Sequence, residues 1–457
     1  MIETSSMRAT TARAAAAVTL LIVTACAGGD AGDADSVAGR TAGTDSAAAA
    51  APCAAGNGGL QLADGFCATV FADAGGGPRH IAVAQNGDVF TQLMTAKRSA
   101  EAGEGSGGIL ALRDTNGDGV ADSSLFYGRT GGTGIGLFDG YLYADETRRI
   151  VRYRLPQGSL VPEGHPNLTP EVIVDGIPTG GHDARNFAIG QDGALYLNIG
   201  SRTNSCQRRD RGNESPGIDP CTELETRAGI WKFDARQTGQ RPTLQNRFAT
   251  GIRNAMGLGF APDGRLWATQ HGRDQLFQNW GKLFDAKYSA ENPAEELVQV
   301  NQGDDFGWPY CYYAVADKKK VTAPEYGGDG RQDTRCGNAK APAATFGGHW
   351  APMALLFYRG NRFPARYRDG VFITFHGSWN RAPEPQAGYR VVFQPLRDGV
   401  ASGPAETFAD GFAGSTVSPD GAQYRPMGLA EAPDGSIYVT DDKGGRIWKI
   451  SWRGGQD

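Results

Sequence analysis

Six stretches of the sequence repeat one pattern: a short apolar strand, an Asn-Gly or Asp-Gly turn, and a second strand of alternating residues. This pattern is the strongest local signal for a β-hairpin. The stretches are 80–93, 134–146, 186–200, 256–270, 366–377 and 427–441, with turn glycines Gly87, Gly140, Gly193, Gly264, Gly370 and Gly435. A hairpin that recurs six times indicates a radial or stacked β-array rather than separate domains.

A radial array explains how 457 residues form one domain. No helical pattern of comparable regularity separates the hairpins, so we predict an all-β fold, a six-bladed β-propeller with four-stranded blades. The long interval between Gly264 and Gly370 predicts an inserted lid segment at about 274–362. Residues 60–72 are expected to complete the last blade and close the ring. Two packed β-sandwiches are the alternative fold.

The composition agrees with a folded chain that has many tight turns. There are 66 Gly and 24 Pro without the period of collagen, and 40% of the residues are hydrophobic. The formal net charge is -5. This charge gives no reason to expect nucleic acid or an anionic membrane surface as a partner.

The first residues predict export. Residues 1–25 place Arg8 and Arg13 ahead of an apolar run too short to span a bilayer comfortably, which indicates a signal peptide. The run ends in Val-Thr-Ala before Cys26 and resembles the bacterial lipobox, and the alternative is an ordinary signal peptide. We expect a lipidated Cys26, a flexible tether over 26–52 and the propeller over 53–457. The expected location is the bacterial cell envelope, periplasm-facing or at the cell surface, with membrane contact only through the lipid anchor.

The six cysteines after Cys26 are an even number in an exported chain, which favours disulfides. Cysteines that are neighbours in the sequence give the pairs Cys53–Cys67, Cys206–Cys221 and Cys311–Cys336. Each would close a short loop and contribute about 3 kcal/mol in the chain-entropy model. None has the spacing of metal ligands or of covalent haem attachment.

The positions just before the inner strand of each predicted blade gather around the central channel. They hold cationic and imidazole side chains: Arg79-His80, His182-Asp183, Arg253-Asn254, His349-Trp350 and Arg425. Clustered unpaired charges in a cleft are costly, so the set predicts an anionic ligand. For any single arginine, the alternative is that it only caps carbonyl groups at a strand end.

Several separated motifs, in the right order, resemble the glucose/sorbosone dehydrogenase family. They are GIRNAMGLGFAPDGRLWATQHGRDQL (251–276), NQGDDFGWPYCYY (301–313), HWAPMALLFY (349–358), FHGSWNRAPEPQAGY (375–389) and RPMGLAEAPDGSIYVTDD (425–442). The resemblance extends over about residues 60–452 and is closest to the L-sorbosone dehydrogenase branch. It implies a six-bladed propeller that uses pyrroloquinoline quinone (PQQ) and Ca2+. The implied activity is hydride transfer to the quinone from a sugar or a sugar-derived aldehyde such as sorbosone, with a quinone or cytochrome as electron acceptor.

The resemblance also implies roles for individual residues. His182 matches the catalytic base, and Arg253 and Asn254 match the pair that contacts the quinone, with Arg253 close to the chemistry. Gly272 and Arg273 match the backbone that holds the active-site calcium. Further contacts to the cofactor are expected from Arg273, Arg381, Arg425 and Asp441, with Arg381 in place of the family lysine.

The chemistry of the implied cofactor explains these residue types. PQQ carries three carboxylates and an ortho-quinone, so its site needs forked cationic donors and a hard cation with oxygen ligands. The imidazole of His182, with a pKa near the working pH, would take the hydroxyl proton as hydride leaves the carbon. The structural alternative is a satisfied histidine in a glycine-rich loop. Trp308, Tyr310 and Trp350 are candidates for lining the sugar site or for packing the lid itself.

The segment DTNGDGVAD (114–122) is a second candidate metal site. Asp114, Asn116 and Asp118 alternate as at the start of an EF-hand loop, and Asp122 would replace the missing glutamate of the twelfth position. A calcium bound here would be structural. The alternative is an Asx-rich turn between two strands.

Two other functions are open from the sequence. A propeller hydrolase of the lactonase type needs a carboxylate-rich calcium site on the axis, where this sequence has His and Arg. A non-catalytic carbohydrate-binding propeller would keep the fold with a site that has lost its activity.

Overall fold

The computed structural model describes residues 55–94, 107–128 and 130–454. The predicted signal peptide (1–25), the tether (26–52) and Cys53 lie outside these residues, as does the predicted lipidation of Cys26. Within the described ranges, no helix combines the length and the apolar character that crossing a membrane requires.

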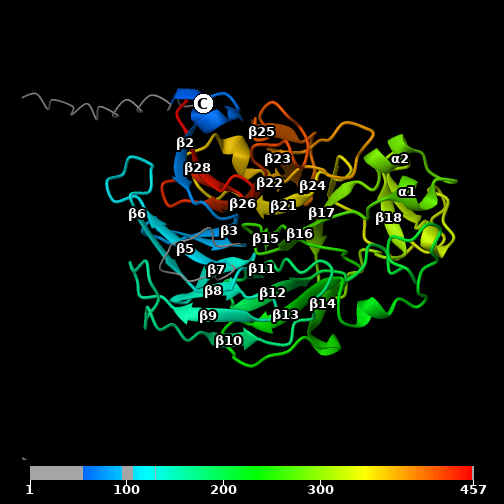
Figure 1. The fold of residues 1–457 in the computed structure, drawn as a ribbon, viewed down its shortest axis with the longest axis horizontal. Helices are drawn as coiled ribbons and strands as arrows, with labels where there is room; N and C mark the ends of the chain where they lie inside the picture. Colours follow the sequence, from blue (N-terminus) through cyan, green and yellow to red (C-terminus); the bar gives the residue numbers. More distant parts are fainter. Residues whose placement is uncertain (1–54, 95–106, 129, 455–457) are drawn as a thin grey trace, which may run out of the picture. The chain divides into compact units, whose positions relative to one another are not determined.

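The chain forms six antiparallel sheets that follow one another around a ring (Figure 1). Blades one to three consist of β3 (Pro78–Val83), β4 (Val89–Leu93), β5 (Gly108–Arg113), β6 (Ser123–Tyr127); β7 (Ile135–Phe138), β8 (Tyr141–Asp145), β9 (Ile150–Arg154), β10 (Glu171–Val174); and β11 (Phe187–Ile189), β12 (Ala194–Ile199), β13 (Gly229–Asp234), β14 (Arg247–Thr250). Blades four to six consist of β15 (Leu258–Phe260), β16 (Leu266–Gln270), β17 (Glu295–Val300), β20 (Ala344–Phe346); β21 (Pro352–Leu356), β22 (Gly370–Phe375), β23 (Arg390–Arg397), β25 (Glu406–Asp410); and β26 (Pro426–Glu431), β27 (Ile437–Asp441), β28 (Arg446–Trp452), β2 (Phe66–Asp73). The predicted six-bladed propeller of four-stranded blades is confirmed, and the two-sandwich alternative is wrong.

The N-terminal part of the chain closes the ring. Strand β2 pairs with β28 and supplies the outer strand of the last blade, as the sequence predicts. The preceding β1 (Gln61–Leu62) pairs instead with β25 of blade five, to which β24 (Val400–Ala401) also adds a short pairing with β23. The predicted closing segment 60–72 is therefore divided between the last two blades.

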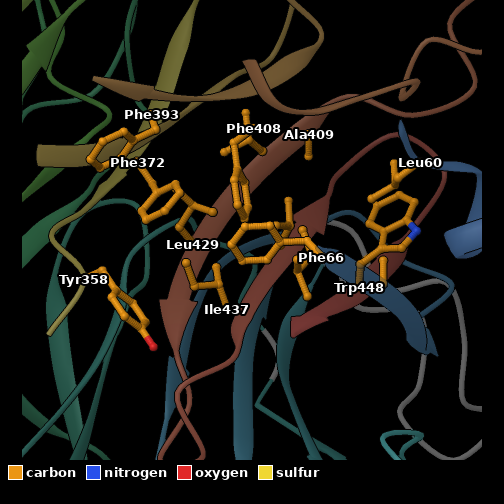
Figure 2. Close-up of a cluster of buried hydrophobic side chains, with 14 of the residues drawn as sticks. Leu60, Phe66, Tyr358, Phe372, Phe393, Phe408, Ala409, Leu429, Ile437 and Trp448 are labelled. Carbon is orange, nitrogen blue, oxygen red and sulfur yellow. The ribbon is translucent and has the colours of Figure 1, made fainter. Parts of the chain in front are cut away.

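An aromatic cluster holds this closure in place. Phe66 of β2 is buried, and its ring centroid lies 4.7 Å from that of Phe363 and 4.8 Å from that of Phe408. Figure 2 shows Phe66 together with Phe408 of blade five and Ile437 and Trp448 of blade six. Strand β2, near the start of the described chain, is thus packed into the same core as the strands of the last two blades.

Five of the six predicted hairpins have the expected strands and turns. Their turn glycines have positive φ, between 76° at Gly140 and 91° at Gly87, a conformation that residues with a Cβ rarely adopt. The stretch 366–377 differs, because Gly370 begins β22 rather than a turn. Residues before it form η5 (Ala365–Arg368), and the inner strand of blade five is β21, further back in the sequence.

The predicted insertion is built into blade four. The helices α1 (Leu276–Trp280) and α2 (Ala286–Glu291) connect β16 to β17, and the hairpin of β18 (Cys311–Ala314) and β19 (Lys319–Thr322) lies between β17 and β20. The remaining short helices are η1 (Ala55–Gly59), η2 (Thr222–Glu225), η3 (Leu244–Asn246) and η4 (Pro324–Tyr326). The segment 274–362 therefore also contains two strands of blade four and the inner strand of blade five.

Two of the predicted disulfides are present, and each closes a long connection between strands. Cys206–Cys221 closes the connection between β12 and β13, and Cys311–Cys336 closes part of the insertion. Cys67 is also disulfide-bonded, and Cys53, which the sequence predicts as its partner, lies outside the described residues.

Buried threonines in the second strands join neighbouring blades. In blade five, Oγ1 of Thr374 accepts a hydrogen bond from Ala354 N–H at 2.9 Å and donates to the carbonyl oxygen of Met427, in the next inner strand, at 2.6 Å. Thr269 of blade four and Thr440 of blade six make the equivalent pairs of bonds. One hydroxyl thus satisfies an inner-strand N–H of its own blade and a carbonyl of the next blade.

The substitution Thr374→Val keeps the shape of the side chain and removes both hydrogen bonds. We expect a loss of about 1–3 kcal/mol in the free energy of unfolding, because a buried N–H and a buried carbonyl lose their partner. Chemical denaturation followed by tryptophan fluorescence measures this loss. Thr345→Val, at an exposed position of β20, is the control and is expected to unfold like the wild type; equal stability of the two variants would contradict the role of Thr374.

Candidate axial site

His182 is held in the loop before the inner strand β11 by Ser201. Its main-chain N–H and its Nδ1 lie 3.0 and 2.8 Å from the carbonyl oxygen of Ser201. Since a carbonyl only accepts, Nδ1 carries the proton and Nε2 the lone pair. Burial and the nearby Arg253 lower the pKa of His182 to about 3. The imidazole is therefore neutral at pH 7, with a pKa further from the working pH than the sequence suggests.

Asp274, in the connection after β16, is the centre of charge at this site. Its Oδ2 accepts hydrogen bonds from Nη2 of Arg253 and Nη2 of Arg211, both at 2.8 Å, and its Oδ1 accepts from Nδ2 of Asn380 at 2.5 Å. Burial alone would raise the pKa of this carboxyl, but Arg253, His349 and Arg211 outweigh burial and hold the pKa well below its usual range. One carboxylate thus ties together loops of blades three, four and five.

Arg253 is almost completely buried but keeps one edge for a ligand. Its Nε and Nη2 donate to the carbonyl and side-chain oxygens of Asn204 at 3.2 and 3.0 Å, and Nη2 also donates to Asp274. No acceptor among residues 55–94, 107–128 and 130–454 engages its Nη1. The neighbouring Asn254 accepts from Nδ2 of Asn198 at 2.9 Å, which leaves its own amide N–H groups as donors.

A second charged group is formed by loops of blades five, six and one. Asp442 accepts from Nε2 of His376 and from Nη1 of Arg79, both at 2.6 Å. Arg425 donates from Nε and Nη2 to the carbonyl oxygens of His376 and Gly377, at 3.0 and 2.5 Å. Burial raises the pKa of Asp442, but the contacts with His376 and Arg79 outweigh burial, so this pKa lies below its usual range.

Main-chain hydrogen bonds join the two groups into one site. His271 N–H donates to the carbonyl of Asn254 at 3.0 Å, and its Nε2 lies 2.8 Å from the carbonyl of Pro352. On the other side, His376 N–H donates to the carbonyl of Ala351 at 2.9 Å. Ser201 N–H also donates to the carbonyl of Arg253, so a chain of hydrogen bonds through the start of β21 connects the loops of His182, Arg253 and Asn254 to Arg425.

Three other residues that the sequence predicts as cofactor contacts bind protein groups instead. Arg273 forms a fully buried ion pair with Glu325 at 2.5 Å, which fixes the insertion. Arg381 donates to the carbonyl of Ala290, to that of Gly348 and to the carboxylate of Glu291, so it ties α2 to the connection after β22. Asp441 accepts main-chain N–H groups of the turn 443–446 and of Arg425. These side chains position the loops of the site rather than facing its axis.

The predicted calcium ligands at Gly272 and Arg273 would be main-chain oxygens. Glu295 accepts from Gly272 N–H at 2.9 Å and from Ala351 N–H at 3.1 Å, which fixes this loop beside β21. Burial raises the pKa of Glu295 to about 8. Across the described part of the chain, no three His, Cys, Asp or Glu side chains form a group that could hold a metal.

The second predicted calcium site is a turn between β5 and β6. Asp114 accepts from the N–H groups of Gly117 and Gly119 at 2.7 and 2.8 Å. Asp118 accepts from Asn116 and from Val120 N–H. Asp122 accepts from N–H and Oγ1 of Thr115. The carboxylates satisfy the backbone of the loop, which is the contact pattern of the Asx-rich turn.

The axial residues that sequence reasoning missed come from one kind of loop. Ser201, Asp274, His376 and Asp442 all follow the second strand of a blade. The cationic and imidazole set is predicted from the positions before the inner strands, and at the ends of the second strands the family resemblance indicates only Gly272, Arg273, Arg381 and Asp441. Both kinds of loop open on the same face of the propeller. The polar runs directly after the second strands, such as GSRT, HGRD, HGS and DDKG, are the signal that could have found them.

A cavity of about 720 Å³ lies at the other end of the inner strands. It is lined by the ends of β3, β15, β21 and β26, among them Val83, Phe260, Leu355 and Pro433. Two charged residues line it: the main-chain N–H of Arg359 donates to the Glu431 carboxylate at 2.8 Å, and the Arg359 guanidinium donates to the carbonyl oxygens of Phe260 and Ala261. The titratable cluster around Asp274 and Asp442 lies at the opposite end of the inner strands. We assign the candidate site to that end, although its open volume is smaller than that of the apolar cavity.

Residues 60–453 match the TrAA12-like family, and the chain belongs to this family. A PQQ-dependent pyranose dehydrogenase of Coprinopsis cinerea is 27% identical over 238 residues, which cover 44% of this chain and 30% of that protein. The chain thus spans less than a third of that curated relative.

Solved structures show the same fold. A Trichoderma reesei enzyme of carbohydrate-active family AA12 superposes with a TM-score of 0.68 at 18% identity, over 86% of this chain and 98% of that chain. The holo form of the PQQ domain of the Coprinopsis cinerea pyranose dehydrogenase superposes with a TM-score of 0.67 at 19% identity, over 86% and 97%.

Asp274→Asn removes the negative charge that holds two arginines. We expect the free energy of unfolding at pH 7 to fall by about 3–5 kcal/mol, because buried cations lose their counter-charge. Since the folded-state pKa of Asp274 is lowered, its stabilising effect is present above the unfolded value of about 3.9 and is lost as the pH falls below it. The stability difference should therefore shrink from pH 5 to pH 3, as measured by urea denaturation.

The control for this prediction is Asp263→Asn, which removes an exposed carboxylate paired with Arg265 at 2.5 Å. Exposed pairs contribute at most about 1 kcal/mol, so this variant should stay close to the wild type. A difference between Asp274→Asn and wild type that did not depend on pH would show that the carboxylate charge is not what stabilises the site.

Proposed function

We propose that the protein is a PQQ-dependent dehydrogenase that oxidises a sugar or a sugar-derived aldehyde. The observation that carries the proposal is the convergence of His182, Arg253, Asn254 and Arg425 on the axial face of the propeller. Membership of the TrAA12-like family and similarity to a PQQ-dependent pyranose dehydrogenase support it. A sorbosone-like aldehyde, from the resemblance of the sequence motifs, is the finer substrate proposal.

The free donors of the site suit an anionic quinone. Nη1 of Arg253 and Nη1 of Arg425 have no acceptor within the described ranges, and Nε of Arg79 is buried without a partner. Such donors fit carboxylate and quinone oxygens, whose charge would complete the neutralisation of the site. Arg253, Asn254 and Arg425 would hold PQQ, and the main-chain oxygens of Gly272 and Arg273 would offer the hard ligands that Ca2+ prefers.

His182 is suited to move the substrate proton. PQQ, when bound, supplies the quinone that accepts a hydride, and with it two electrons, from the carbon that carries the hydroxyl group. The lone pair at Nε2 of His182 accepts the hydroxyl proton, so that the carbon is left as a carbonyl. The carbonyl of Ser201 holds the tautomer by accepting from Nδ1, and Asp274 holds Arg253 in one orientation.

The cellular setting is part of the proposal. The leader sequence and Cys26 support export and a lipid anchor in the bacterial envelope, with the propeller facing the periplasm or the cell surface. An electron acceptor, a quinone or a cytochrome, would then reoxidise the cofactor. Cleavage and lipidation are checked by mass spectrometry of the membrane fraction.

Reconstitution tests the proposed function directly. PQQ and CaCl2 are added to the purified protein, uptake is followed by quinone absorbance, and aldoses and ketoaldehydes are screened with an artificial electron acceptor. We expect uptake of PQQ and turnover of at least one sugar or sugar aldehyde. Lactone hydrolysis without PQQ would instead support a hydrolase, and PQQ-independent binding of carbohydrate without turnover would support a binding protein.

Replacing the proposed base separates chemistry from cofactor binding. His182→Gln is expected to lower kcat by about 10²–10⁴, the range of general base catalysis, while the affinity for PQQ stays unchanged. His165→Gln, on an exposed loop, is the control and should retain full activity. Because the pKa of His182 is about 3, the acid limb of the kcat/KM profile is expected below pH 5. A near-normal kcat in His182→Gln would remove this residue from the mechanism.

A further inference from the structure

Trp379 differs from all other tryptophans of the chain. The sequence has eight tryptophans, and the structure describes every one. The side chain of Trp379 makes the residue 52% exposed, whereas the other seven tryptophans are buried or half-buried. Its neighbours are not exposed: Ser378 is fully buried, and Asn380 is 9% exposed. The exposed indole therefore projects from a buried segment of the loop.

The loop that carries Trp379 is fixed by hydrogen bonds on both sides of it. Ser378 N–H donates to the carbonyl of Ala387 at 2.8 Å, and the hydroxyl of Tyr389 donates to the carbonyl of Ser378 at 2.7 Å. On the other side, Asn380 donates to Asp274 at 2.5 Å. A backbone held in this way is ordered before a ligand arrives, so little backbone entropy is lost on binding.

The indole lies beside the charge centre of the candidate site. The guanidinium carbon of Arg211 is 6.0 Å from the centroid of the Trp379 ring, and the same guanidinium donates to Asp274 at 2.8 Å. Nη1 of Arg211 also donates to the side chain of Gln275 at 3.0 Å. Asp274 in turn holds Arg253. Trp379 is thus an exposed aromatic face bordered by polar groups on the axial side of the propeller.

The other aromatic candidates for a sugar site are engaged in packing. Trp308 is 5% exposed and donates to the carbonyl of Asn204 at 3.0 Å. The hydroxyl of Tyr310 accepts from Cys221 N–H at 2.8 Å, and the ring of Trp350 packs edge-on against Phe375 with centroids 5.4 Å apart. These residues hold the insertion and blade five together. They leave Trp379 as the aromatic surface that a substrate can reach.

We propose that Trp379 is a stacking platform for the pyranose ring of a cyclic sugar. The C–H groups on one face of a pyranose are apolar and weakly positive, so they pack on the negative face of an indole, while the hydroxyl groups at the ring edge meet Arg211 and Gln275. The inference rests on the proposed function and narrows its substrate class. It assigns a ring-form sugar to the site in preference to a small open-chain aldehyde.

The test compares ring-form and open-chain ligands on the full chain loaded with PQQ and CaCl2. D-glucose, D-galactose and D-xylose are titrated by tryptophan fluorescence, and KM and kcat are measured for these sugars and for glyceraldehyde, which has no pyranose ring. Trp379→Ala is expected to weaken sugar binding and raise KM roughly three- to tenfold, with a smaller effect on kcat. Trp379→Phe, which keeps a ring, should restore binding, and the KM for glyceraldehyde should stay the same in all variants.

Phe277→Ala is the matched control, because Phe277 is an exposed aromatic residue that belongs to α1 and not to the loop after β22. It should bind sugars like the wild type. Equal sugar affinity in wild type and Trp379→Ala, or no binding of these sugars by the wild type, would overturn the inference. A loss of PQQ affinity in Trp379→Ala would also overturn it, because the indole would then cover the cofactor. Sugar binding without oxidation by the wild type would contradict the proposed function but not the stacking role.

Discussion

Closure of the ring is the constraint on which the rest of the structure depends. A propeller blade is a small twisted sheet whose inner strand is too short to be stable alone, and it needs a neighbour on each side. Here the last blade takes its outer strand, β2, from the beginning of the chain, and Phe66 carries that strand into the core of blades five and six. Three buried threonines then join blade four to five, blade five to six and blade six to one. The axial loops converge because the ring leaves them no other position.

These loops bring several buried cationic side chains close together, and shared carboxylates balance their charge. Arg253, Arg211 and the imidazoles of blades three to five meet in a poorly hydrated volume, where unpaired cations are costly. Asp274 binds the two arginines Arg253 and Arg211, and Asp442 binds Arg79 together with the imidazole of His376. The pairing is incomplete at Nη1 of Arg253 and Nη1 of Arg425, for which the described part of the chain supplies no acceptor. Because the other buried charges are balanced, these free guanidinium N–H groups are the positions where an anionic ligand would complete the charge balance.

The sequence predicts the architecture well because its signals are local. Asp-Gly and Asn-Gly turns between alternating strands report the hairpins directly, and neighbouring cysteines report the 206–221 and 311–336 disulfides. The hairpin prediction is wrong at Gly370. There the Asp-Gly dipeptide leads into β22, and the inner strand of the blade, β21, lies further back in the chain. Residues that act through tertiary contacts are less visible. Nothing in HGRD distinguishes Asp274, which binds two arginines, from Arg273, which turns away to pair with Glu325.

The inner strands also explain why the site opens on one face only. Met256, Met353 and Met427 follow the axial loops of blades four, five and six, and they are buried together with Ala184 against them. Methionine is flexible and polarisable, so three of these side chains fill an axis whose six blades contribute different residues. They lie between the charged loops and the cavity of about 720 Å³ at the other end of the strands. The methionines thus separate the apolar cavity from the charged loops, and Trp379 and the axial arginines belong to the same side of this cluster.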